Sequence, residues 1–256
     1  MRIPSRTVYR AAIAAILATG FLSASSGVRA QIPDKFTNLK VFNKKIAKDD
    51  LVQAMRGMSI SLGVRCGYCH AQKAGASMTL GHVPLDFASD EKPTKGTARK
   101  MLKMVSDIND KYLAKLEPKA KLDVGCVTCH HGLPRPEPLA DIMKRTVADS
   151  GATVAVARYE ALRGIYYGSA SYDFTESSLN SAAESLLKDG KAADAVALLE
   201  LNAQHNTPGD RMQALLGDAY LATGDKDKAR AAYQKSLEAN PDNPRVKKAL
   251  EGLGAQ

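Results

Sequence analysis

Apolar side chains recur every three or four residues along most of the chain, a spacing that predicts amphipathic helices. Two aspartates at positions 49 and 50 can cap a helix over 49–62, and Gly63 is suited to ending it. A second, longer helix is predicted over 94–116, whereas the glycines and prolines of 71–93 predict a loop. The apolar stripes of the two helices consist of Leu51, Met55, Met58 and Leu62, and of Met101, Met104, Val105, Ile108 and Tyr112.

The C-terminal half also follows a helical pattern, and part of it repeats after 34 residues. Beyond a proline-rich exit at 133–138, helices are predicted over 139–149 and 153–167. From about Ser177, small residues recur where two helices would cross and larger ones where they would fill the groove. The matching positions are Ala183, Leu186, Gly190, Ala195 and Leu199, then Gly217, Tyr220, Gly224, Ala229 and Tyr233. This pattern resembles the tetratricopeptide repeat, and 244–253 would cap the stack.

Two copies of the string C-x-x-C-H follow the two methionine-bearing helices, at 66–70 and 126–130. This string is typical of covalent haem attachment, in which two thiols bond to the porphyrin and the histidine binds the iron. Two other readings are a zinc site made of all four thiolates and a redox dithiol in each motif. A histidine directly after both pairs, and the long gap between the pairs, favour haem. The predicted attachment residues are Cys66, Cys69, Cys126 and Cys129, and the predicted iron ligands are His70 and His130.

A six-coordinate haem needs a second axial ligand, and a methionine thioether is a soft donor that favours ferrous iron. Met55 is the candidate for the first haem, with Met58 or His82 as alternatives. Met104 is the candidate for the second haem, with Met101 as its alternative. These methionines could instead only pack the core.

The N-terminus has the pattern of a secretory signal. A positive region that contains three arginines precedes an apolar run over 11–22, and small residues precede Gln31. We expect cleavage after Ala30 and a periplasmic mature protein without a transmembrane span. An uncleaved anchor is the alternative, but the apolar run is shorter than the roughly 20 residues that a span requires.

Charge is unevenly distributed along the chain, whose formal net charge is +9. Residues 31–150 contain 20 Lys and Arg against 13 Asp and Glu, whereas residues 151–256 contain 12 against 14. Haem propionates would cancel part of the positive charge, and any remaining patch could steer an acidic redox partner. Nothing in the pattern indicates nucleic-acid binding.

The order Met55, 66–70, Met104 and 126–130, with the text Lys95-Gly-Thr-Ala-Arg-Lys-Met-Leu-Lys-Met104, resembles one haem pair of a known family. That family is the tetrahaem cytochrome subunit of photosynthetic reaction centres, and the likeness covers roughly residues 35–135. In that family the methionine ligand lies on a helix upstream of its own motif, which implies the methionine assignments above. This chain has two motifs rather than four.

We therefore predict a mainly α protein with a helical dihaem cytochrome c domain at 31–138 and a helical linker at 139–176. A tetratricopeptide-like α-α superhelical domain with a cap helix follows at 177–256. The predicted function is electron transfer by two covalently bound haem c groups, without enzymatic activity. The repeats would dock the carrier onto a redox protein, such as a membrane-bound electron-transfer complex, or form an oligomer. The alternatives are a dihaem peroxidase, which needs one open iron face, and a repeat scaffold with structural or sensory haems.

Overall fold

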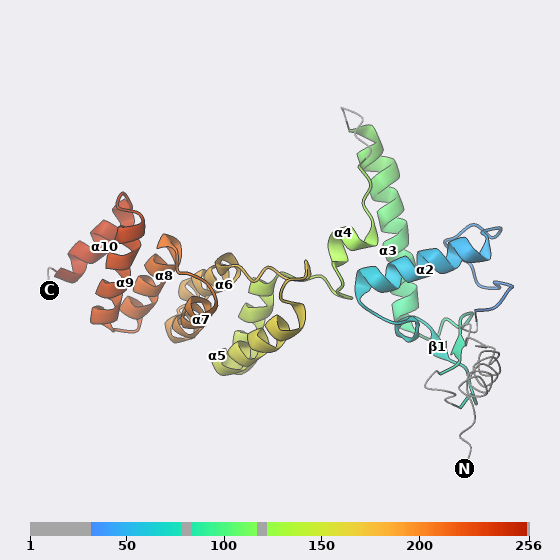
Figure 1. Cartoon of the computed structure of the whole chain (residues 1–256), viewed down its shortest axis with the longest axis horizontal. Coiled ribbons are helices and arrows are strands. Elements are labelled where there is room, and N and C mark those ends of the chain that lie inside the picture. Colours follow the sequence, from blue (N-terminus) through green and yellow to red (C-terminus); the bar gives the residue numbers. More distant parts are fainter. Residues whose placement is uncertain (1–31, 78–82, 117–121, 255–256) are drawn as a thin grey trace, which may run out of the picture. The chain divides into compact units, whose positions relative to one another are not determined.

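The computed structural model describes residues 32–77, 83–116 and 122–254, and it is mainly α, as predicted (Figure 1). The predicted signal peptide and the alternative ligand His82 lie outside the described residues. No helix in the described part is both long and apolar enough to cross a bilayer.

The chain divides into two compact units. One contains the residues up to Val52 together with Arg65–Asp110, and the other contains Gln53–Val64 and the residues from Lys111 onward. Each unit therefore includes one of the two C-x-x-C-H motifs. The proposed limits of the dihaem domain, the linker and the repeats stay predictions.

The first unit contains the 3-10 turn η1 (Cys66–Tyr68), the strands β1 (Ala71–Gln72) and β2 (Leu85–Asp86), and the helix α3 (Pro93–Asp107). The two strands are antiparallel, and Ala71 lies opposite Asp86. The loop predicted over 71–93 therefore contains one short pair of strands that was not predicted. Two-residue strands carry no alternation that a sequence pattern could reveal.

The helices that precede the motifs begin close to where the pattern places them. Helix α2 (Lys48–Leu62) ends before Gly63, whose φ of 63° is the left-handed conformation of a helix C-terminus. Helix α3 ends at Asp107, and the chain continues as a π-helix over Ile108–Tyr112 and a 3-10 turn over Leu113–Lys115. The predicted single helix to 116 is therefore three helical segments, because an apolar stripe does not fix the hydrogen-bonding pattern.

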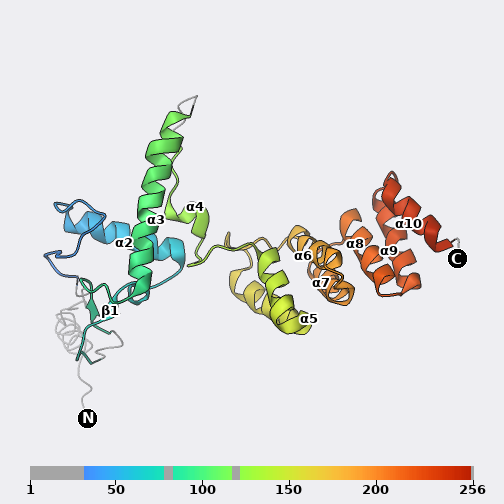
Figure 2. The ribbon, with the colours of Figure 1, turned by 180° about the vertical axis from the view of Figure 1, so that it is seen from behind.

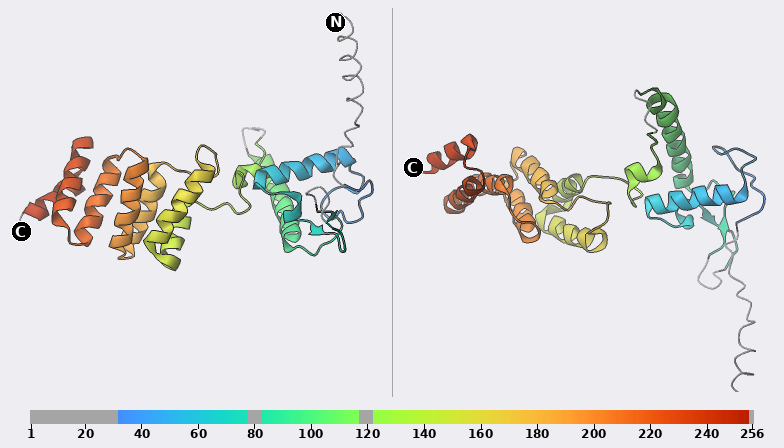
Figure 3. Two further views of the ribbon diagram at one scale, coloured as in Figure 1. Left: turned by 60° about the horizontal axis from the view of Figure 1, so that its bottom comes forward. Right: turned by 45° about the horizontal axis from the view of Figure 1, so that its top comes forward.

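The second unit contains α4 (Cys126–His130) and a series of antiparallel helices from α5 to the C-terminus (Figures 2 and 3). Gly151, with φ 82° and ψ 169°, interrupts α5, in agreement with the two helices predicted there. The helices of this series are α5 (Leu139–Tyr166), α6 (Glu176–Lys188), α7 (Ala192–His205), α8 (Asp210–Ala222), α9 (Lys226–Ala239) and α10 (Pro244–Gly254).

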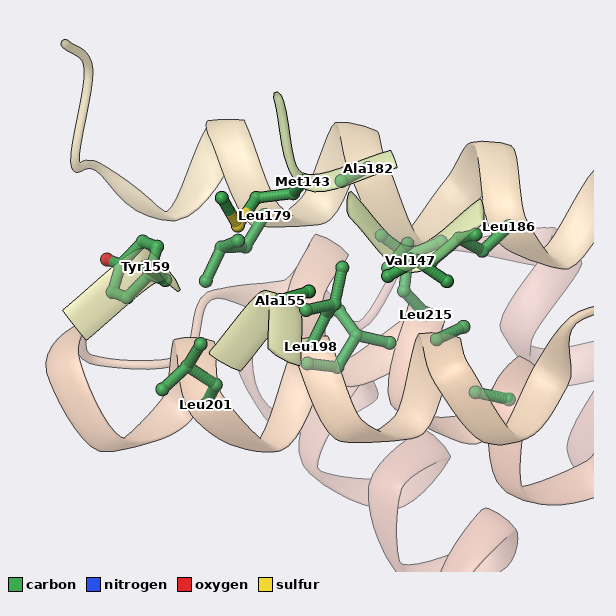
Figure 4. Packing of buried hydrophobic residues seen from close by; sticks show 14 of the residues in the cluster. Met143, Val147, Ala155, Tyr159, Leu179, Ala182, Leu186, Leu198, Leu201 and Leu215 are labelled. Atoms are coloured by element: carbon green, nitrogen blue, oxygen red, sulfur yellow. The ribbon is translucent and has the colours of Figure 1, made fainter. Parts of the chain in front are cut away.

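Most buried apolar side chains belong to this series. Met143 and Tyr159 of α5 pack with Leu179 of α6 and Leu198 of α7 (Figure 4). In the next repeat, a Cβ added to Gly217 would lie 2.4 Å from the ring of Tyr233, so the absence of a side chain lets α8 and α9 approach. The larger set of repeat positions is buried as expected: Ala183, Leu186, Ala195, Leu199, Ala229 and Tyr233. Gly190 and Gly224 were expected where helices cross, but both are exposed and follow the ends of α6 and α8 in the left-handed conformation, with φ 74° and 87°.

Candidate haem-attachment sites

The first motif forms a single tight turn. The backbone N–H groups of Cys69 and His70 both donate to the carbonyl of Cys66, at 3.2 Å and 3.0 Å. Cys66 is exposed, Cys69 is half-buried, and both are free thiols. Burial raises the pKa of the Cys69 thiol. The turn therefore offers the two free thiols that thioether attachment needs.

The start of α3 holds the two residues between these cysteines. Lys92 Nζ donates to the carbonyl of Gly67, and Thr94 Oγ1 donates to the carbonyl of Tyr68 at 2.6 Å. These two side chains bind carbonyls that have no partner within the turn, and they thereby fix its backbone. Sequence reasoning did not identify Lys92 or Thr94 as part of the site.

His70 lies at the end of the two-stranded ladder. Ala71 pairs with Asp86, and the same register places His70 opposite Phe87. The two rings lie 4.9 Å apart between centroids, at an angle of 59°. The ring of Phe87 therefore lies on the imidazole of the predicted iron ligand.

The surroundings of His70 favour its neutral form. Burial lowers the pKa of His70, and the positive charges of Lys95 and Arg99 lower it further. Neutral imidazole is the form that binds a metal. The Nδ1 atom of His70 is buried and has no hydrogen-bond partner among the described residues.

The second motif forms the short helix α4. The backbone N–H of Gly125 donates to Thr128 Oγ1 at 3.0 Å, which closes the first turn. The Nδ1 atom of His130 lies 2.7 Å from the carbonyl oxygen of Leu133. Since a carbonyl only accepts, Nδ1 carries the proton and Nε2 keeps its lone pair for a metal.

A left-handed turn follows α4 and connects it to two other segments of the second unit. His131 has φ 46° and Gly132 has φ 83°. Gly132 N–H donates to the carbonyl of Ser61 at 2.8 Å, and Ser171 Oγ donates to the carbonyl of His131 at 2.6 Å. The end of α2 and the loop before α6 therefore both fix the backbone next to the second motif.

Large apolar side chains near the second motif in sequence are exposed. Leu122 and Val127 have exposed fractions of 56% and 55%, and Tyr112 is 67% exposed. A porphyrin has large apolar faces, so a haem attached to the C-x-x-C-H motif would cover the exposed apolar side chains beside it. At the first motif, the free thiols and the neutral His70 fit covalent haem. At the second motif, the free thiols, the orientation of His130 and the exposed apolar side chains fit it.

The candidate methionine ligands occupy the predicted helices. Met55 and Met58 lie on α2 and are half-buried, as is Met101 on α3, whereas Met104 on α3 is 44% exposed. The choice of Met55 and Met104 stays a prediction. Across residues 32–77, 83–116 and 122–254, no three His, Cys, Asp or Glu side chains are grouped as a metal site would require.

Comparison with known proteins gives two family matches along the chain. Residues 75–193 match the family model of the photosynthetic reaction centre cytochrome C subunit, and residues 186–253 match the tetratricopeptide repeat. The first match includes the second motif but begins after the first one, and it extends further toward the C-terminus than the expected 35–135. Over 77 residues, 30% of the chain, it is 38% identical to cytochrome c-554 of Chloroflexus aurantiacus, and the match spans 16% of that protein's length. The resemblances to a reaction-centre cytochrome and to the repeat are thus confirmed, and electron transfer of the cytochrome c type is supported.

Proposed function

We propose that this chain is an exported dihaem c-type cytochrome that transfers electrons between redox proteins and docks onto one of them through its repeats. The observation that carries the proposal is the environment of the two C-x-x-C-H motifs: each offers two free thiols and a histidine held in a metal-binding form. When bound, each haem supplies an iron that alternates between the ferric and ferrous states.

The residues of the chain have distinct roles in this proposal. The four cysteines of the motifs would hold the porphyrins, and His70 and His130 would bind the irons. Met55 and Met104 would be the other ligands of the irons and would keep water and peroxide from them. The export signal delivers the chain to the periplasm, where haem is attached.

The axial ligands can be tested by spectroscopy of the purified full-length holoprotein. Met55→Ala and Met104→Ala should each convert one of the two haems from low spin to high spin, because a thioether ligand is lost. Met58→Ala and Met101→Ala are matched controls on the same helices and should leave both haems low spin. A high-spin haem in the wild type would instead favour the peroxidase alternative.

The docking role can be tested by cross-linking the holoprotein in a membrane fraction through its lysines, with the sites mapped by mass spectrometry. Lysines lie on both the haem segment and the repeats, so the chain contains its own control. Cross-links to a redox protein should concentrate in 177–256. Cross-links confined to 31–138 would contradict docking through the repeats.

A further inference from the structure

Lys95, on the first turn of α3, is a buried lysine in the unit that contains the first motif: 11% of its side chain is exposed. Its ammonium donates to three consecutive carbonyls, those of Phe87 at 2.9 Å, Ala88 at 3.3 Å and Ser89 at 2.6 Å. One ammonium therefore binds every carbonyl of the loop over 87–89. The loop is therefore folded around this one cation.

The positive charge of Lys95 is only partly neutralised. Asp90 Oδ1 lies 3.3 Å from Lys95 Nζ, but the same carboxylate also binds Lys40 at 2.6 Å and Arg99 at 2.8 Å. Asn38 Nδ2 donates to it as well, at 2.9 Å. Hydrogen bonds from these groups, that of Lys40 foremost, hold the pKa of Asp90 well below its usual range. Three cations thus share one carboxylate.

Phe87 connects this cluster to His70. Its carbonyl is bound by Lys95, and its ring contacts the imidazole of His70. The backbone on either side is fixed too, because Asp86 Oδ1 accepts the N–H groups of Ala88 at 2.9 Å and Ser89 at 3.0 Å. Movement of the loop away from Lys95 would carry the ring away from the imidazole.

We propose that Lys95 is a positioning residue for His70 at the first motif. It holds the loop that keeps the ring of Phe87 against the imidazole, and its positive charge favours the less positive, ferrous state at that site. The inference rests on the proposed function, since it requires haem at 66–70. Lys95, which lies outside the motif, would thus set the orientation of His70 and the reduction potential of the haem at 66–70.

The second motif gives an internal comparison. His130 is oriented by the carbonyl of Leu133 rather than by a ring and a lysine. A hydrogen bond of this kind raises the basicity of the imidazole as a ligand, which favours the ferric state. Loss of Lys95 should therefore affect one of the two haems and leave the other unchanged.

The test is a redox titration of the full-length holoprotein with Lys95→Met, which keeps an unbranched side chain one atom shorter and removes its charge. The higher of the two potentials should fall by about 59 mV or more, a tenfold change in a one-electron equilibrium. The electron paramagnetic resonance signal of the same haem should shift, because the imidazole plane is less constrained. Lys103→Met makes the same change of charge at an exposed position of α3 and should move neither potential by a comparable amount.

Phe87→Leu gives a second variant that leaves the cluster of charges intact. It should shift the resonance signal of that same haem with a much smaller change of potential. The inference is refuted if Lys95→Met moves neither potential, moves both equally, or acts no more strongly than Lys103→Met. A haem count below two in the wild type would instead refute the proposed function, and this inference with it, whereas two haems without the expected shift refute only the inference.

Discussion

Replacing Gly63 with alanine should destabilise the backbone around the second motif. Gly63 has φ 63°, and a Cβ there would lie 2.1 Å from the carbonyl oxygen of Gly132, two residues after the motif's histidine. The left-handed conformation costs an alanine roughly 1–2 kcal/mol. Overpacking against a backbone atom that is itself fixed adds about 1–3 kcal/mol. The free energy of unfolding should therefore fall by about 2–5 kcal/mol.

Gly75 is the matched control for this prediction. Its φ is 70°, but a Cβ at this position would have no atom within 4 Å, so Gly75→Ala bears only the conformational cost. With a urea dependence of about 1–3 kcal/mol per molar, an extra 2 kcal/mol lowers the unfolding midpoint of Gly63→Ala by about 1 M relative to Gly75→Ala. The midpoint is measured by urea titration of the holoprotein, followed at the haem absorbance bands. Equal midpoints for the two variants would show that the close approach of Gly63 and Gly132 does not support the second site.

Three further outcomes are expected. Gly217→Ala should lower the thermal midpoint of the repeats, measured by calorimetry, because the added Cβ meets the ring of Tyr233 and this outweighs the roughly 1 kcal/mol by which alanine favours a helix over glycine. Gly164→Ala is the control: open space surrounds that position, so the midpoint should rise, and a rise in both variants would contradict the packing of Gly217 against Tyr233. Burial raises the pKa of Tyr220 to about 12, so the stability gained from the protonated hydroxyl is complete below about pH 10 and is lost as pH rises toward 12. Melts followed by circular dichroism should show a falling thermal midpoint over this pH range, and Tyr220→Phe should make the fall smaller. His131→Gly should increase stability by up to about 1 kcal/mol in a thermal melt, since glycine adopts its φ of 46° without strain, and a loss of stability would refute this.

The helices and the repeats could be predicted because their patterns are long. The stripe on α2 and the 34-residue period place apolar and small residues at positions that recur several times, and the structure buries Ala195 and Ala229 at equivalent places. The kink in α5 was also indicated, by the polar and glycine residues around Gly151.

The contacts that hold His70 in place could not be predicted in the same way. The contact of Phe87 with His70 depends on a strand pairing of two residues per strand, and the burial of Lys95 depends on a loop that folds back on it. Both are tertiary arrangements, and a lysine in a basic segment usually predicts a solvated surface. The proline and glycine content of 71–93 indicated a loop but not what the loop would enclose.

The central claim is that two haems are attached through the cysteines of the two C-x-x-C-H motifs. The most direct measurement is the intact mass of the exported, purified chain under denaturing conditions, combined with peptide mapping of 66–70 and 126–130. We predict an added mass equal to two haem groups, with one group on each motif peptide. A chain that carries no covalently added group, or carries one only at a single motif, would contradict the claim.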